Sequence, residues 1–93
     1  MSMPPVWAFE FDDANEAEFA GHGIYPEQIL QVLSNPHRIE ANRRRRRATH
    51  RMIGLDAGGR WLTIPIEPTH ERGVWRPVTA WPSSMAERGR FGR

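Results

Sequence analysis

The spacing of apolar residues changes along the chain and marks out its secondary structure. Over residues 6–11, Trp7, Phe9 and Phe11 alternate with other residues, which is the period of a β-strand. Residues 13–20 open with Asp-Ala-Asn-Glu, the pattern of a capping box whose first residue is the N-cap. The N-terminal part therefore predicts a short strand and then a helix, which glycines at positions 21 and 23 end.

A second helix has the clearest signals in the chain. Pro26 suits the first helical position because an N–H has no partner there, and Glu27 suits the positive end of the helix dipole. Asn35-Pro36 ends the helix because the residue before a proline avoids helical geometry. The apolar face of this helix consists of Ile29, Leu30, Val32 and Leu33.

From residue 37 onward the patterns are those of strands. We expect strands over 49–56, 60–67 and 74–81, with Ala-Gly-Gly and His-Glu-Arg-Gly as the turns between them. Tight turns join consecutive strands into antiparallel pairs. Pro65 predicts either an edge position or an irregularity in its strand, because proline lacks the N–H that a ladder needs.

The order of these elements predicts an α+β protein. A last short helix is expected over 85–91, after Pro82-Ser-Ser. The expected fold is a small antiparallel sheet of three to four strands, packed with two N-terminal helices and this short C-terminal helix. We expect a single domain over residues 1–93, with residues 1–5 as a flexible leader and residues 42–47 as an arginine-rich connection.

Composition narrows the class of protein. The chain has no cysteine, so it carries neither disulfides nor thiolate metal sites. It shows no signal-peptide features and no apolar run of roughly 20 residues that would span a bilayer, so a cytoplasmic location is expected. All 13 basic residues are arginine, yet the net charge is only +2. The position of the arginines is therefore more informative than the net charge.

Five consecutive arginines are the most distinctive feature of the chain. Arginine makes bidentate hydrogen bonds to phosphate and stacks on bases. Such a run predicts a polyanionic partner, which is RNA, DNA or an acidic protein. The run consists of Arg43, Arg44, Arg45, Arg46 and Arg47.

Histidines and tryptophans add candidate chemistry. The histidines show no metal-ligand spacing, and neither a metal nor a cofactor is expected. His22, between two glycines at a helix end, and His50, just after the arginine run, are candidates for proton transfer.

The predicted strand phases place Trp61, Trp75 and Trp81 on one non-core face, where aromatic rings stack on bases. The alternative is that two of the three belong to the core.

Several short motifs, taken in order, resemble the BrnT toxins, which are RelE-type ribonuclease toxins of type II toxin–antitoxin systems. The first match is to the family's F-E-W-D-like strand and its N-x-x-K-H-G-I/V motif, and the second is to its hairpin and its R-I-I-S-A-R strand. The matching residues are Phe9-Glu-Phe-Asp12, Asn15, His22-Gly-Ile24, Ile53-Gly54, Gly59-Arg60 and Arg76-Pro-Val-Thr-Ala-Trp81.

The resemblance implies a RelE-like fold and a metal-independent endoribonuclease that cleaves RNA and arrests translation. It also implies a cognate antitoxin as partner, ribbon-helix-helix-like and DNA-binding. The chain departs from the family at two cations, because Gly21 stands in place of the lysine before H-G and Trp81 in place of the strand's last arginine. The basic position of the middle strand is displaced to Arg47 or Arg51.

These observations assign roles to named residues. We expect His22 or His50 to transfer protons, and Arg51 and Arg76 to stabilise the phosphate. Contacts to RNA are assigned to Arg43, Arg44, Arg45, Arg46, Arg47, Arg60 and Trp81. The run from Arg43 to Arg47 is expected either to hold the substrate or to dock the antitoxin. One alternative is a non-catalytic arginine-rich module on the same fold that binds nucleic acid or a partner protein. A further alternative is an accessory subunit whose arginine run meets an acidic protein.

Overall fold

The molecule is built around a mixed sheet whose two longest strands, β3 and β4, lie at its centre. A computed structural model describes residues 5–43 and 47–91. Within them the strand order is β1-β5-β4-β3-β2, and β6 pairs with β4 beside β5. The strands are β1 (Ala8–Phe9), β2 (His37–Ala41), β3 (His50–Leu55), β4 (Trp61–Pro68), β5 (Val74–Pro77) and β6 (Trp81–Pro82).

The α+β class is confirmed, but the predicted sheet of three to four antiparallel strands is wrong. Six strands form the sheet in the described residues, and β1 pairs with β5 in parallel. The other pairs are antiparallel. Tight turns fix only the hairpins, whereas β1 reaches its partner through a long connection, which is how parallel pairs form.

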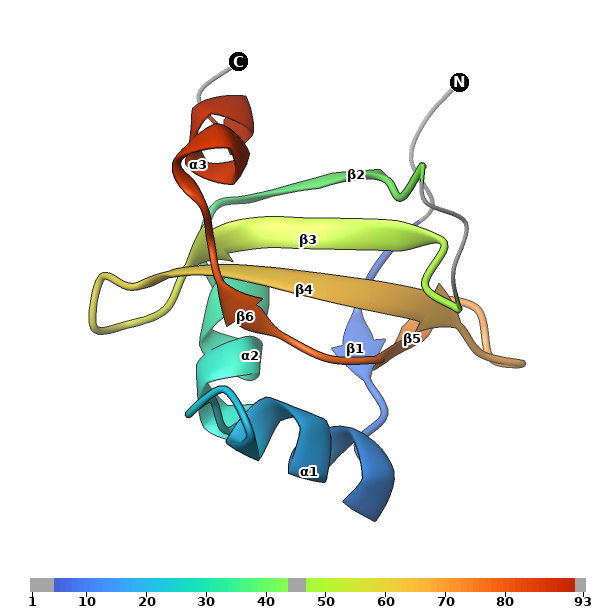
Figure 1. The fold of residues 1–93 in the computed structure, drawn as a ribbon. Helices are drawn as coiled ribbons and strands as arrows, with labels where there is room; N and C mark the ends of the chain where they lie inside the picture. The colour runs from blue at the N-terminus through green and yellow to red at the C-terminus, as the bar shows by residue number, and fades with distance from the viewer. Residues whose placement is uncertain (1–4, 44–46, 92–93) are drawn as a thin grey trace.

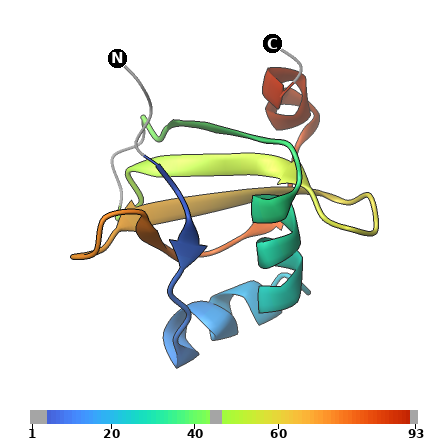
Figure 2. The ribbon, with the colours of Figure 1, turned by 180° about the vertical axis from the view of Figure 1, so that it is seen from behind.

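Three helices cover the two faces of this sheet unequally. α1 (Asp13–Ala20) and α2 (Pro26–Ser34) lie on one face, and α3 (Met85–Phe91) lies on the other (Figure 1). The view from behind shows the same division (Figure 2). None of the described helices is long and apolar enough to cross a membrane. We call the two sides the α1–α2 face and the α3 face.

The hydrophobic core lies between the sheet and the helix pair. Burial of these apolar side chains contributes most of the stabilisation of the fold. Alternate residues of β4 point into the core, as the period of a strand requires. The core consists of Phe19, Ile24, Ile29, Val32, Met52, Leu62, Ile64, Ile66, Trp75 and Ala80.

The expected strand over 74–81 is divided in two. β5 ends at Pro77, and the chain rejoins β4 only at Trp81. Between the two pairings, the Val78 N–H donates to the Pro65 carbonyl at 2.8 Å. Pro65 therefore lies inside β4 at a break in pairing, so the irregularity was predicted correctly and the edge position was not. Because of the break, Trp75 points into the core while Trp81 lies on the α3 face.

Asn15 connects α1 to the sheet. The helix N-cap is Asp12 rather than Asp13, and the capping box joins Asp12 and Asn15. The Asn15 amide nitrogen donates to the carbonyls of Glu10 at 3.1 Å and Pro77 at 2.9 Å. Its amide oxygen accepts from the Asp12 N–H at 2.9 Å. The side chain thus ties the start of α1 to the end of β5.

Replacing Asn15 should therefore destabilise the fold strongly. Asn15 is 1% exposed, and Asn15→Ala leaves buried carbonyls without a donor, which costs about 2–4 kcal/mol. Urea unfolding followed by circular dichroism measures the change. Glu18→Ala, on the exposed side of the same helix, should change stability by less than about 0.5 kcal/mol. Equal effects of the two substitutions would contradict this role of Asn15.

Candidate functional site

Strand β3 carries two predicted catalytic residues on opposite sides of the sheet. His50 packs against Trp75 on the α1–α2 face, with ring centroids 5.1 Å apart and planes at 86°. Arg51 lies on the α3 face, where it bonds Glu40 of β2. Consecutive residues of a strand point to opposite faces, so these two side chains do not share a site.

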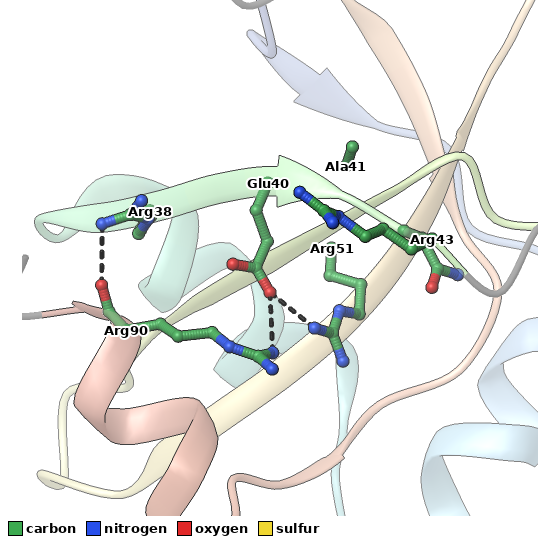
Figure 3. Close-up of a pocket in the computed structure, with 7 residues that line it drawn as sticks. Arg38, Glu40, Ala41, Arg43, Arg51 and Arg90 are labelled. Carbon is green, nitrogen blue, oxygen red and sulfur yellow. Dashed lines mark hydrogen bonds and ion pairs between the residues drawn. The ribbon is translucent and has the colours of Figure 1, made fainter.

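Arg51 is held by carboxylates from two elements. Its Nη2 bonds Glu40 Oε1 at 2.5 Å, and its Nη1 bonds Glu87 Oε2 of α3 at 3.3 Å. Arg90 of α3 also bonds Glu40 Oε1, at 3.1 Å. Figure 3 shows the Glu40 carboxylate between the two guanidinium groups. Arg38 of β2 completes the cluster by donating from Nη1 to the Arg90 carbonyl at 2.8 Å.

Glu87 is ionised in spite of its burial. Burial raises its pKa, but hydrogen bonds from the backbone of Ser84 and from the side chains of Trp81, Thr63 and Ser84 outweigh this, so the net pKa is lowered. The Trp81 indole N–H lies 3.3 Å from both carboxylate oxygens. Glu87 thereby fixes Trp81 beside Arg51.

Two hollows adjoin around Arg51, and together we call them the arginine cleft. Asn42 and Arg51 line both of them. The first, of about 490 Å³, is lined by Arg38, Glu40, Ala41, Asn42, Arg43, Arg51 and Arg90. The second, of about 510 Å³, is lined by Asn42, Arg47, Ala48, Arg51, Pro65, Val78, Thr79, Trp81 and Glu87.

The two described ends of the arginine run reach this cleft. Arg43 lines the first hollow and Arg47 the second, and both are exposed. Arg47 Nη2 bonds Glu67 Oε2 at 3.0 Å with most of its side chain still in solvent. Arg44, Arg45 and Arg46 lie outside the described residues. The connection between β2 and β3 therefore brings the described part of the run to the α3 face.

Arg76 lies in a separate network. It bonds Asp12, the N-cap of α1, through Nε at 2.6 Å and Nη2 at 3.0 Å. Its Nη1 bonds Glu67 Oε2 at 3.0 Å. The Arg76 hydrogen bonds, with that of the Asn15 backbone, lower the pKa of Asp12 to about 2. The hydrogen bonds to Asp12 and Glu67 raise the pKa of Arg76. Arg76 thus connects β5 to α1 and to β4.

Neither of the predicted imidazoles lines the arginine cleft. His22 is exposed in the turn between α1 and α2, on the side of the sheet away from α3 (Figure 1). His50 is half-buried beside Trp75, and burial lowers its pKa. The predicted set of a histidine with Arg51 and Arg76 is therefore not assembled.

A third hollow does place a histidine beside Arg76. It has a volume of about 570 Å³ and includes His70, Glu67 and Glu71 in its lining. In the described part of the chain, no group of three or more His, Asp or Glu is arranged to hold a metal ion. Sequence reasoning assigned no role to His70, because the turn that holds it has no motif.

Arg60 and the tryptophans differ in their relation to the cleft. Arg60 is exposed in the turn between β3 and β4, at the opposite end of β3 from the arginine run. Trp75 is 5% exposed and donates from Nε1 to the Pro5 carbonyl at 2.9 Å. Trp81 alone of the predicted trio lines the cleft. The predicted common face of Trp61, Trp75 and Trp81 is therefore wrong at Trp75.

Several residues of the cleft were missed by the sequence analysis. In β2, Arg38 and Glu40 alternate with the inward-facing residues of the strand, so a period of two was present as a signal. No local periodicity of this kind marked Asn42, Glu87 or Arg90. In the comparisons with known proteins, no protein-family model and no curated protein matches this chain. The likeness to BrnT toxins rests on the motifs alone and stays a prediction.

The Asp12–Arg76 pair makes stability depend on pH in acid. Because the folded pKa of Asp12 is about 2, below the ordinary 3.8, the unfolded chain binds the proton first as pH falls. The stabilisation is complete above about pH 4 and is lost between pH 4 and 2. Asp12→Asn keeps a capping side chain but removes the charge, so its stability should fall less steeply in this window.

Urea midpoints measured from pH 2 to 7 test this expectation. The difference between the wild type and Asp12→Asn should be largest at neutral pH and should shrink towards pH 2. Asp13→Asn, at the exposed neighbouring position, should follow the wild-type curve. Parallel curves for the wild type and Asp12→Asn would show that Arg76 does not stabilise the Asp12 carboxylate.

Proposed function

We propose that this protein binds RNA in the arginine cleft as a binding module. The observation that carries the proposal is an excess of arginine over carboxylate on one concave face. Among the described residues that line the cleft, the arginines outnumber the carboxylates Glu40 and Glu87; they are Arg38, Arg43, Arg47, Arg51 and Arg90. Arg47 is also paired with Glu67. Such an excess attracts a polyanion and raises its rate of association.

The internal ion pairs support this role in a specific way. Arg51 is 18% exposed and doubly paired, so it is positioned before any ligand arrives. Arg43 and Arg47 are exposed and extend the positive surface along the rim of the cleft. Guanidinium groups that are already oriented lose less conformational entropy when they bind phosphate.

The second hollow favours RNA over an acidic protein. Ala48, Pro65, Val78 and Trp81 give it an apolar wall beside the arginines. Unpaired bases bind to aromatic and apolar side chains while the backbone phosphates contact arginine. An acidic peptide would use the charges but would have no need of this wall.

Removing the rim charges should weaken RNA binding and reduce its salt dependence. For Arg43→Gln and Arg47→Gln combined, the slope of log affinity against log salt should fall by about 0.7 for each lost phosphate contact. Fluorescence anisotropy with a labelled RNA hexamer, at several salt concentrations, measures it. Arg72→Gln, in an exposed turn that lines neither hollow, is the control. Equal slopes for all variants, or binding only to acidic peptides, would overturn the proposal.

A second candidate function is the toxin implied by the BrnT resemblance, a metal-independent ribonuclease that acts in the cytoplasm. One observation favours this candidate. It indicates a carboxylate as the general base, in place of the predicted histidines. Glu40 Oε1 bonds two arginines, whereas its Oε2 has no hydrogen-bond partner among the described residues. In this proposal Glu40 accepts the proton of the 2′-hydroxyl, whose oxygen attacks the adjacent phosphorus, and Arg51 stabilises the charge on the phosphate. The bond from phosphorus to the 5′-oxygen breaks, and that oxygen takes a proton from water. The antitoxin partner belongs to this same candidate.

The ribonuclease candidate predicts cleavage that a chelator does not stop. Glu40→Gln should lower the rate by about a hundredfold or more, because it removes the general base. His22→Ala, on the other side of the sheet, should leave the rate unchanged. Gel analysis of a labelled RNA in EDTA measures both. Binding without cleavage would leave the binding module as the function, and loss of cleavage in His22→Ala would restore the histidine mechanism.

A further inference from the structure

Strand β2 forms an open edge of the sheet. It is the last strand in the order β1-β5-β4-β3-β2 and makes one border of the sheet (Figure 1). The opposite border, β1, is only two residues long. β2 has five residues without a proline, and its register with β3 has no bulge. An edge of this kind is a template for pairing with another strand.

The pairing with β3 determines which backbone groups of β2 point outward. The Asn42 N–H donates to the Thr49 carbonyl at 2.9 Å, and the backbone groups of successive strand residues alternate in direction. The outward N–H and C=O groups are therefore those of His37, Ile39 and Ala41. Within the described residues, no strand or other backbone group pairs with them. The edge can thus accept a further strand.

The charges on β2 match those of a second copy of β2. In an antiparallel pair centred on Ile39, Arg38 lies opposite the partner's Glu40, and Glu40 lies opposite the partner's Arg38. These positions are non-hydrogen-bonded pairs, in which opposed side chains lie closest. A shift by two residues places either two Arg38 or two Glu40 side chains opposite each other, which like charges disfavour. The pattern therefore selects one partner and one register.

Both charged side chains have the capacity for these contacts. Glu40 bonds Arg51 and Arg90 through Oε1, whereas its Oε2 has no hydrogen-bond partner among the described residues. Arg38 donates to the Arg90 carbonyl at 2.8 Å and makes a further contact. A guanidinium group has five N–H donors, so Arg38 can keep these contacts and bond a carboxylate of the partner as well.

We infer that two copies of this chain associate through their β2 strands into one continuous sheet. Ile39 pairs with the partner's Ile39, and His37 pairs with the partner's Ala41, through their outward backbone groups. The twofold axis is perpendicular to the sheet, so the two arginine clefts lie on the same side of the dimer. The interface is small, so the dimer is weak and depends on concentration. The inference goes beyond the proposed RNA binding and does not depend on it.

Sedimentation equilibrium of the protein without RNA tests the association. From about 1 µM to 1 mM, which covers weak interfaces, the mean mass should rise from that of one chain towards that of two. In Arg38→Glu, carboxylates oppose each other on both sides of the axis, so the association constant should fall about tenfold or more. Arg72→Glu makes the same change of charge in an exposed turn and should associate like the wild type.

Circular dichroism checks that each variant is folded. A wild type that stays a single chain over the whole range would overturn the inference. So would a folded Arg38→Glu variant that associates as strongly as Arg72→Glu.

Cross-linking tests the register without a change of charge. The chain has no cysteine, so Ile39→Cys introduces a single thiol beside the twofold axis, where opposed Cβ atoms lie about 5 Å apart. A short bis-maleimide should join two such chains efficiently. Ala17→Cys, at an exposed position of α1, should be joined only by random collision. Equal yields at the two positions would rule out pairing through β2, even for a protein that is dimeric.

Discussion

The positions of α1 and α3 on the sheet depend on the neutralisation of two arginines that are mostly buried on or beside the sheet. The side chains of Arg51 and Arg76 are only 18% and 14% exposed, and a guanidinium group removed from water needs charged partners. Arg51 is paired with Glu40 and Glu87. Arg76 is paired with Asp12 and Glu67. These pairs attach α3 to β3 and α1 to β5, so the charges that stabilise the fold also set where its helices lie.

The same constraint decides which arginines are available to a ligand. Arg76 is paired with Asp12 and Glu67, so its role is to connect β5 to α1 and to β4. Among the described residues that line the cleft around Arg51, arginines outnumber carboxylates, and the cleft has an apolar wall. The histidines lie outside this cleft, since β3 turns His50 to the opposite side of the sheet. The balance of charge therefore favours binding of a polyanion over the predicted histidine chemistry.

Local sequence signals predicted much of the fold. They predicted little of the site, because the site is formed by residue pairs that are distant in sequence. Pro26 and the capping pattern near Asp12 place the helices within a residue or two. Strict alternation along β3 separates His50 from Arg51, because consecutive side chains of a strand point to opposite faces. The break after Pro77, which reverses the expected face of Trp75, depends on a hydrogen bond from Val78 to β4. Nothing local to Arg51 indicates that Glu40 and Glu87 are its partners, because the sheet register and the docking of α3 create those contacts.

The most direct measurement is an NMR titration of the protein with a short RNA, following the indole N–H signals of Trp81 and Trp75. Trp81 lines the arginine cleft, whereas Trp75 is buried on the α1–α2 face. We expect the Trp81 signal to shift with RNA concentration, together with the side-chain amide of Asn42, while the Trp75 signal stays in place. Shifts confined to Trp75 and the imidazoles of His22 and His50, with Trp81 unchanged, would contradict it.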